Sequence, residues 1–223
     1  MPQPQVDIIL YLHGHKEPCG LDDSDSIDAY WSEKPFRDKR LGDKLFTLRK
    51  EINCTGKNVI LVAPTLGPKA QFGGLTNPRI FEAYLNDVLA ALTEYGPYQN
   101  VGTGLTYGNI ILACHSAGGV PMRQLARGEH AYADRISECW GFDCLYHAKG
   151  SNPAEEWAEW ADEHKNARLF IHYLKGTRPL SEDLKNSHKP NVVVEKSTAT
   201  NHCVVPKNHW QQRLKASSSL KEK

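Results

Sequence analysis

The sequence predicts an α/β protein, in which a mostly parallel central sheet of about six strands has helices on both faces. Two observations carry this prediction. Six short apolar runs alternate along the chain with segments of helical periodicity. Strands separated by helices are joined by crossovers, which place neighbouring strands parallel. A third observation bears on function, because polar or glycine-containing segments follow several of the runs, at the sheet edge where α/β proteins place their sites.

The expected strands are short and bounded by glycine, proline or polar residues, as strands in a covered parallel sheet should be. They are residues 6–12, 58–63, 109–113, 136–142, 167–174 and 191–197. The third run ends in a turn of small residues around Ser116, and the fourth is followed directly by Asp143.

The expected helices have clear start and stop signals. Asn77-Pro78 and Asn152-Pro153 each combine a capping side chain with a proline in the first turn. Further helices are expected over residues 41–52, with Gly56 as a stop, over 120–127, and from about Pro206.

One domain is expected over residues 1–215, with residues 216–223 as a flexible tail. A chain of 223 residues can bury a sizeable core as a single unit. Residues 16–35 are expected as a long loop, and loops of this length are often functional.

Composition argues against several classes of protein. A formal net charge of +1 supplies no field that would attract nucleic acid. No apolar run approaches the roughly 20 residues of a membrane span. Residues 1–5 do not resemble a signal peptide, a pattern expected of a cytoplasmic protein and equally of a secreted one whose signal has been removed. The six cysteines form no C-x-x-C pair, and disulfides are left open.

The stretch Cys114-His115-Ser116-Ala117-Gly118 has the features of a nucleophile elbow. It follows an apolar strand and precedes a helix, and small residues let the chain turn sharply so that a serine hydroxyl stands clear of the backbone. The free N–H groups of the following helix favour a developing negative charge. The alternative is a strand-to-helix turn without chemistry.

A serine hydroxyl needs a general base, and the base needs a group that orients it. His202 is the candidate base, because it follows the last strand in a short polar loop. Asp143 is the candidate acid, since it follows a strand directly, but Glu182 and the aspartates of residues 22–28 remain open as alternatives. His115 is expected to pack behind the elbow.

Stabilising an oxyanion requires preorganised N–H donors. We expect one from the backbone of Ala117, directly after the nucleophile. The second is expected from the loop after the first strand, where Gly14 permits a close approach and the His15 N–H is the preferred donor.

From the loop at Gly14 through the elbow to His202, the chain resembles the α/β-hydrolase superfamily, including the order serine, acid, histidine. It departs from the family pattern at Cys114, which replaces the first elbow glycine, and at Asp143, which lies one strand earlier than the commonest position of the acid. The resemblance implies a minimal core, similar in extent to that of small esterases. The resemblance implies a serine hydrolase that cleaves carboxylic esters through an acyl-enzyme; an amidase or peptidase with the same triad, and a non-catalytic binding protein of this fold, are the alternatives.

The expected partner is a small ester, with a pocket walled by Trp31, Phe72 and Tyr146. No cofactor and no metal are expected. The spacing of Asp143, Cys144 and His147 matches no strong zinc pattern. Neither a phosphate-binding loop nor a dinucleotide fingerprint is present, which argues against nucleotide chemistry.

Overall fold

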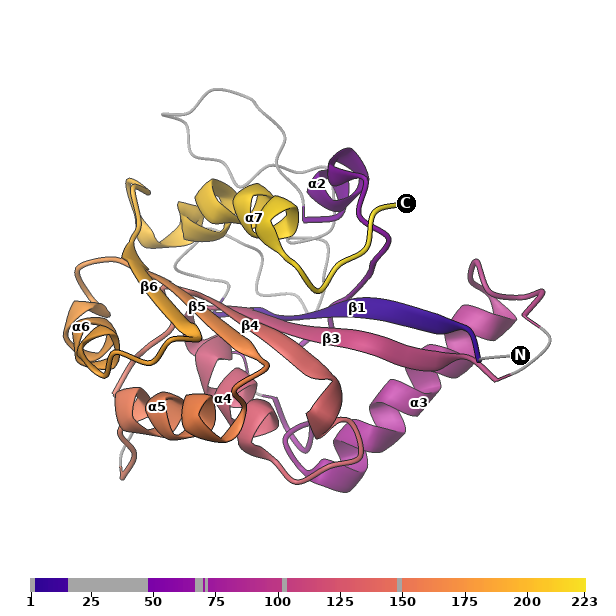
Figure 1. Ribbon diagram of the computed structural model, residues 1–223, viewed down its shortest axis with the longest axis horizontal. Helices are drawn as coiled ribbons and strands as arrows, with labels where there is room; N and C mark the ends of the chain where they lie inside the picture. Colours follow the sequence, from indigo (N-terminus) through magenta and orange to yellow (C-terminus); the bar gives the residue numbers. More distant parts are fainter. Residues whose placement is uncertain (1–2, 16–47, 67–69, 71, 102–103, 148–149) are drawn as a thin grey trace.

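The computed structural model describes residues 3–15, 48–66, 70, 72–101, 104–147 and 150–223. Its centre is a six-stranded sheet in the order β2-β1-β3-β4-β5-β6, and every neighbouring pair runs parallel. Helices cover both faces of this sheet (Figure 1). The predicted α/β class with a parallel sheet of six strands is confirmed.

Each strand overlaps one of the expected apolar runs. The strands are β1 (Gln5–Leu12), β2 (Ile60–Val62), β3 (Thr106–His115), β4 (Ile136–Phe142), β5 (Arg168–Tyr173) and β6 (Val192–Lys196). Strand β3 begins earlier than its apolar run because Tyr107 is buried and pairs with Val6. It also ends later, so that the strand reaches the residue before Ser116.

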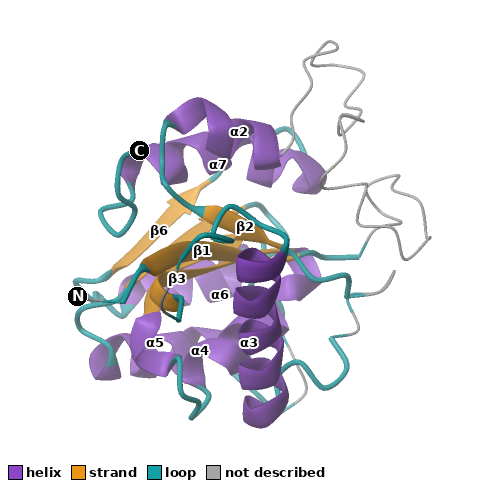
Figure 2. Ribbon diagram, turned by 90° about the vertical axis from the view of Figure 1, so that its right-hand side faces the viewer, coloured by secondary structure: helices purple, strands orange, loops and turns teal. Residues whose placement is uncertain are grey.

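The helices form two layers (Figure 2). One layer holds α2 and α7, and the other holds α3, α4, α5 and α6. The bounds are α2 (Leu48–Thr55), α3 (Pro78–Glu94), α4 (Gly119–Arg127), α5 (Pro153–Glu163), α6 (Arg178–Asn186) and α7 (Val205–Ala216). Each layer has its own apolar cluster against the sheet. Tryptophans anchor both clusters, with Trp210 packing edge-on to Trp140 beneath α7 and Trp157 edge-on to Trp160 in α5.

Local signals explain most helix starts. The Asn77 side chain accepts hydrogen bonds from the backbone N–H groups of Arg79 and Ile80 at the start of α3, and Asn152 accepts one from Ala154 at the start of α5. Helix α6 was not anticipated from the sequence. It buries only Leu180, Ser181 and Leu184 against the sheet, which is a short apolar signal.

The segment 216–223, expected as a flexible tail, lies against the body of the protein. The Ser217 hydroxyl donates to the buried Glu138 carboxylate at 2.6 Å, and the Lys223 N–H donates to the Gly56 carbonyl at 2.8 Å. These contacts join the end of the chain to strand β4 and to the end of α2. Its polar sequence gave no sign of these long-range partners.

The carboxyl ends of the strands meet at one edge of the sheet, because all six strands are parallel. The segments after β1, β3, β4 and β6 therefore lie at the same edge, and they carry Gly14, Ser116, Asp143 and His202. This is the edge at which α/β proteins place their binding sites. None of the helices in the described ranges is long and apolar enough to cross a membrane.

Candidate functional site

Ser116 lies in a sharp turn between strand and helix. Strand β3 ends at His115, a short 3-10 turn covers Ser116–Gly118, and α4 begins at Gly119. Ser116 has a φ of 55°, in the left-handed region that residues with a side chain seldom adopt. Such a conformation costs about 1–3 kcal/mol and persists only where the surroundings impose it.

The surroundings of the turn explain why its residues must be small. A Cβ on Gly118 would lie 2.1 Å from the Leu12 carbonyl oxygen, and one on Gly119 would lie 2.4 Å from the Cys144 carbonyl oxygen. The start of α4 is therefore pressed between the ends of β1 and β4. A side chain at either glycine would force the elbow apart.

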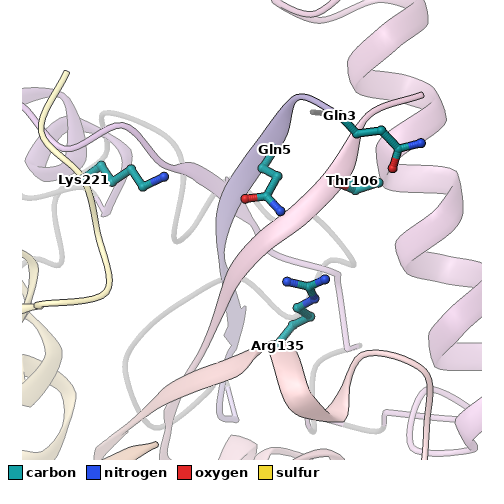
Figure 3. Close-up of a pocket in the computed structure, with 5 residues that line it drawn as sticks. All are labelled: Gln3, Gln5, Thr106, Arg135 and Lys221. Atoms are coloured by element: carbon teal, nitrogen blue, oxygen red, sulfur yellow. The ribbon is translucent and has the colours of Figure 1, made fainter. Parts of the chain in front are cut away.

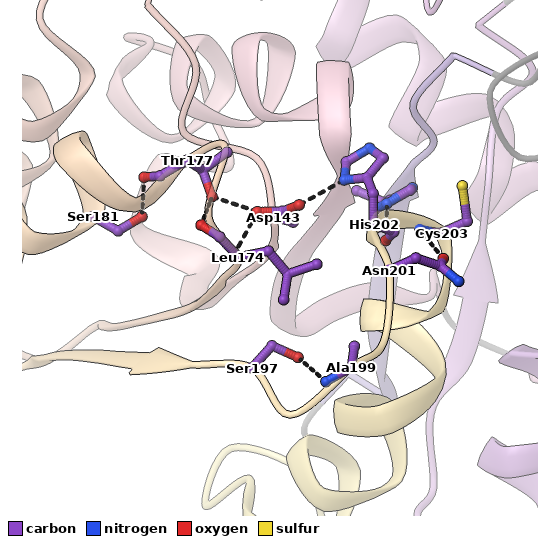
Figure 4. A network of polar contacts seen from close by, with 10 residues as sticks. Asp143, Leu174, Thr177, Ser181, Ser197, Ala199, Asn201, His202 and Cys203 are labelled. Carbon is purple, nitrogen blue, oxygen red and sulfur yellow. Dashed lines mark hydrogen bonds and ion pairs between the residues drawn. The ribbon is translucent and has the colours of Figure 1, made fainter.

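His202 is held by a carboxylate at its inner ring nitrogen. Its Nδ1 lies 2.7 Å from Asp143 Oδ2, and the Asp143 side chain is almost fully buried (Figure 4). His202 begins a 3-10 turn, His202–Val204, where the Asn201 side chain accepts a hydrogen bond from the Cys203 N–H at 3.0 Å. The turn after β6 thus carries His202 to an acid that follows β4.

Asp143 is itself fixed from several directions. Its φ is 49°, and its own N–H donates to the His172 carbonyl at 2.7 Å. Its Oδ1 accepts from the Leu174 N–H at 2.9 Å and from the Thr177 hydroxyl (Figure 4). Both oxygens of the carboxylate are therefore committed, one to His202 and one to the segment after β5.

These contacts keep the carboxylate ionised at neutral pH. Burial by itself would raise the pKa of Asp143, but the hydrogen bonds from His202, Thr177 and Leu174 outweigh it and hold the pKa below its usual value. An ionised carboxylate can only accept, so His202 Nδ1 donates to it. The other ring nitrogen, Nε2, is left with a lone pair that can take a proton.

His115 supports His202 from behind the elbow, as the sequence suggested. The two rings lie 4.4 Å apart between centroids, and His115 Nε2 donates to the His202 carbonyl oxygen at 3.0 Å. Burial first, and the neighbouring His202 second, lower the pKa of His115 to about 3. His115 therefore stays neutral near pH 7 and fixes the His202 backbone.

The loop after β1 lies directly against Ser116. A Cβ on Gly14 would approach the Ser116 Cβ to 2.5 Å and its Oγ to 3.2 Å. The Leu66 N–H donates to His13 Nε2 at 2.8 Å, so the His13 proton resides on Nδ1 and is donated to the Gly14 carbonyl at 2.7 Å. A trans peptide holds its N–H opposite its carbonyl, which turns the His15 N–H away from the His13 ring.

Tyr146 lies beside the two candidate residues Ser116 and His202. Its phenol interacts with the Ser116 side chain, and its ring lies edge-on to the His202 ring with 6.3 Å between centroids. The side chain is 39% exposed. Of the other residues expected in the pocket, Phe72 packs against the larger apolar cluster and Trp31 lies outside the described residues.

The alternative acids do not displace Asp143 within the described residues. Glu182 accepts a hydrogen bond from the Tyr173 hydroxyl instead of contacting His202. The aspartates of residues 22–28 lie outside the described part of the chain. The structure thus joins His202 to Asp143 by a hydrogen bond and places Ser116 at the same edge of the sheet, after β3.

A disulfide was not foreseen from the sequence. Cys203, the residue after His202, is disulfide-bonded. Cys54, Cys114, Cys139 and Cys144 are free thiols. Across the described ranges, no three His, Cys, Asp or Glu side chains gather in a way that could hold a metal ion.

An open polar cavity of about 570 Å³ lies at the opposite edge of the sheet (Figure 3). Gln5 and Thr106 begin β1 and β3, and Arg135 immediately precedes β4, so the cavity is at the amino ends of the strands. It is remote from Ser116 and contributes nothing to the candidate site.

A scan of protein-family models found no match, and a search of curated proteins found none. Among solved structures, the chain is similar to prolyl oligopeptidase B from Galerina marginata bound to a 25mer macrocyclization substrate, with 13% identity and a TM-score of 0.36. The match covers 99% of this chain and 33% of that one. The same oligopeptidase bound to a 35mer substrate matches with 14% identity, a TM-score of 0.36, and coverage of 99% and 34%. The chain therefore spans about a third of the length of these structures.

Proposed function

We propose that the protein is a serine hydrolase of the α/β-hydrolase type that cleaves carboxylic esters through an acyl-enzyme. One observation carries the proposal: a buried, ionised Asp143 holds His202 by its Nδ1, beside an elbow in which Ser116 has a left-handed backbone. A strand-to-helix connection without chemistry needs neither the backbone strain nor the buried carboxylate.

In the first step, Ser116 Oγ attacks the ester carbonyl carbon while its proton passes to His202 Nε2. Asp143 stabilises the imidazolium that forms and keeps the ring in the required tautomer. The backbone N–H groups of Ala117 and His15 hold the negative oxygen of the tetrahedral intermediate. His13 supports this role because its bond to the Gly14 carbonyl orients the peptide that carries the His15 N–H.

Collapse of the intermediate breaks the bond to the alcohol oxygen, which takes the proton from His202 Nε2. The acyl group remains on Ser116 Oγ. Water then repeats the sequence, losing a proton to Nε2 as it attacks and releasing the carboxylic acid as the proton returns to Oγ. All proton transfers use one histidine, and no cofactor enters.

An activated serine can be tested with a fluorophosphonate probe and peptide mapping. We expect one label per chain on Ser116 and none on Ser116→Ala, whereas the matched variant Ser187→Ala, altered beside α6, keeps the label. A folded wild-type protein without label would contradict the proposal and favour a binding protein of this fold.

The ester assignment needs its own measurement. We expect turnover of p-nitrophenyl acetate to exceed that of the matching p-nitroanilide amide by at least about 100-fold, because an amine leaving group requires more complete protonation as the bond breaks. Comparable rates on both would replace the esterase with an amidase or peptidase that uses the same residues.

A further inference from the structure

The nucleophile lies between two loops that approach it from opposite sides. In the sheet order, β3 lies between β1 and β4, so the loop after β1 is on one side of Ser116 and the loop after β4 is on the other. Gly14 belongs to the first loop and Tyr146 to the second. The candidate backbone donor of the β1 loop, the His15 N–H, therefore lies on one side of Ser116, and Tyr146 lies on the other.

Tyr146 belongs to a segment with several backbone contacts. Its N–H donates to the Cys144 carbonyl at 3.2 Å, and Cys144 is buried against Gly119 at the start of α4. The same four-residue segment begins with Asp143, whose N–H is tied to β5. Tyr146 is therefore attached, three residues on, to the segment that holds Asp143.

The Tyr146 hydroxyl lies close to the two groups that move the proton. Its phenol interacts with the Ser116 side chain, and its ring stands at 80° to the ring of His202, with 6.3 Å between the centroids. Burial raises the pKa of Tyr146 well above its usual value, so the phenol keeps its proton near pH 7. It can therefore donate a hydrogen bond during the reaction but does not act as a base.

We propose that Tyr146 is a catalytic residue that donates a hydrogen bond to the leaving-group oxygen of the ester. This inference rests on the proposed esterase function and adds a residue to it. It predicts a substrate class as well: esters of poorly acidic alcohols, whose leaving oxygen needs stabilisation when the bond breaks.

Geometry explains how the Tyr146 hydroxyl can reach the leaving group. In the tetrahedral intermediate, Ser116 Oγ and the leaving oxygen are bonded to the same carbon, so a donor within reach of one is within reach of the other. Ser116 Oγ becomes an ester oxygen, which is a weak acceptor, whereas charge grows on the leaving oxygen as its bond to carbon breaks, so the leaving oxygen is the better acceptor for the Tyr146 hydroxyl. The proton transferred still comes from His202 Nε2, and Tyr146 retains its own.

Tyr146→Phe tests the proposal with two acetate esters that differ in the acidity of the alcohol. The variant removes one oxygen from a partly exposed ring. We expect kcat/KM for ethyl acetate to fall at least about 10-fold, which is the loss of one hydrogen bond of about 1.4 kcal/mol. The fall for p-nitrophenyl acetate should stay below about threefold, because p-nitrophenolate leaves without help.

The comparison uses kcat/KM because that quantity reports acylation for both esters and excludes deacylation of their common acetyl-enzyme. Tyr95→Phe is the matched control, since Tyr95 follows α3 and is 77% exposed. It should leave both rates unchanged.

Equal losses on the two esters would overturn the proposal and reduce Tyr146 to holding Ser116 in place. Unchanged rates on both would overturn it too. Failure of the proposed function itself gives a different result: wild-type protein would cleave neither ester, or Ser116→Ala would cleave them as fast as wild type.

Discussion

Two pairs of histidine rings pack closely in the described part of the chain, and one of them lies directly behind Ser116. His115 and His202 are 4.4 Å apart between ring centroids, and His172 and His209 are stacked at 3.9 Å. In each pair, a buried histidine of the sheet has a pKa lowered to about 3, chiefly by burial. Its partner comes in each case from the segment after β6.

The pairs differ in their carboxylates. His202 Nδ1 is 2.7 Å from the buried Asp143, whereas the nearest carboxylate to His172 Nδ1 is Glu195, at 3.7 Å, with a side chain 53% exposed. His209 Nε2 is hydrogen-bonded to the Ser197 hydroxyl, at 2.7 Å. Close rings are therefore common to both pairs, and the buried carboxylate at Nδ1 of His202 distinguishes the first pair.

The largest effect should distinguish His202 from His209, the member of each pair that follows β6. We expect His202→Gln to lower kcat for p-nitrophenyl acetate by about 10⁴-fold or more, because the proton of Ser116 then has no acceptor. His209→Gln should stay within about threefold of wild type in kcat and should instead cost about 1–2 kcal/mol of unfolding free energy through the lost ring packing. Equal losses of activity in the two variants would contradict the assignment of His202.

The next largest effect should distinguish the two carboxylates, Asp143 and Glu195, by the loss of kcat when each is replaced by its amide. We expect Asp143→Asn to lower kcat by about 10³–10⁴-fold, because a side-chain amide can donate to Nδ1 and hold the wrong tautomer. Glu195→Gln, at the exposed carboxylate of the other pair, should change kcat by less than about twofold. Steady-state kinetics on p-nitrophenyl acetate decides the matter, and an active Asp143→Asn enzyme would reopen the choice of acid.

The two buried histidines of the sheet, His115 and His172, should make the stability of the protein sensitive to acid. Unfolded histidines bind a proton below about pH 6.5, whereas His115 and His172 resist protonation until about pH 3. The unfolded state thus binds more protons in this window, so stability falls as the pH is lowered from about 6.5 towards 3. The slope is up to about 1.4 kcal/mol per pH unit for each histidine.

His172→Leu sharpens this comparison because it removes one of the two titrating groups. We expect the variant to lose about 2 kcal/mol less than wild type between pH 6.5 and 5, measured by urea unfolding. The exposed His188→Asn is the control and should follow the wild-type curve. If His172→Leu and wild type lose the same free energy, the histidine of the second pair does not carry the acid sensitivity.

The smallest effect concerns the hydroxyl groups that support each pair. Thr177 donates to Asp143, and Ser197 bonds to His209. We expect Thr177→Val to lower kcat about 10-fold, since Asp143 then holds His202 less firmly. Ser197→Ala should leave kcat unchanged, and each variant should cost about 1 kcal/mol of stability. A fall in kcat for Ser197→Ala equal to that for Thr177→Val would mean that both act through global stability.

Local residue patterns account for the parts of the fold that were predicted. The six apolar runs, the Asn-Pro helix starts at Asn77 and Asn152, and the small residues around Ser116 act through neighbours in the chain, so a single sequence reveals them. Parallel strands then place Ser116, Asp143 and His202 at one edge, because the carboxyl ends of such strands meet.

Tertiary structure alone decided the rest. It placed Asp143 against His202, bound Glu182 to Tyr173, tied Ser217 to Glu138 and brought the Tyr146 ring against His202. Each of these choices depends on which segments become neighbours in space, often far apart along the chain. The sequence by itself determined which residue types stand at the strand ends, whereas the order of the strands and the packing of their loops determined which of those side chains meet.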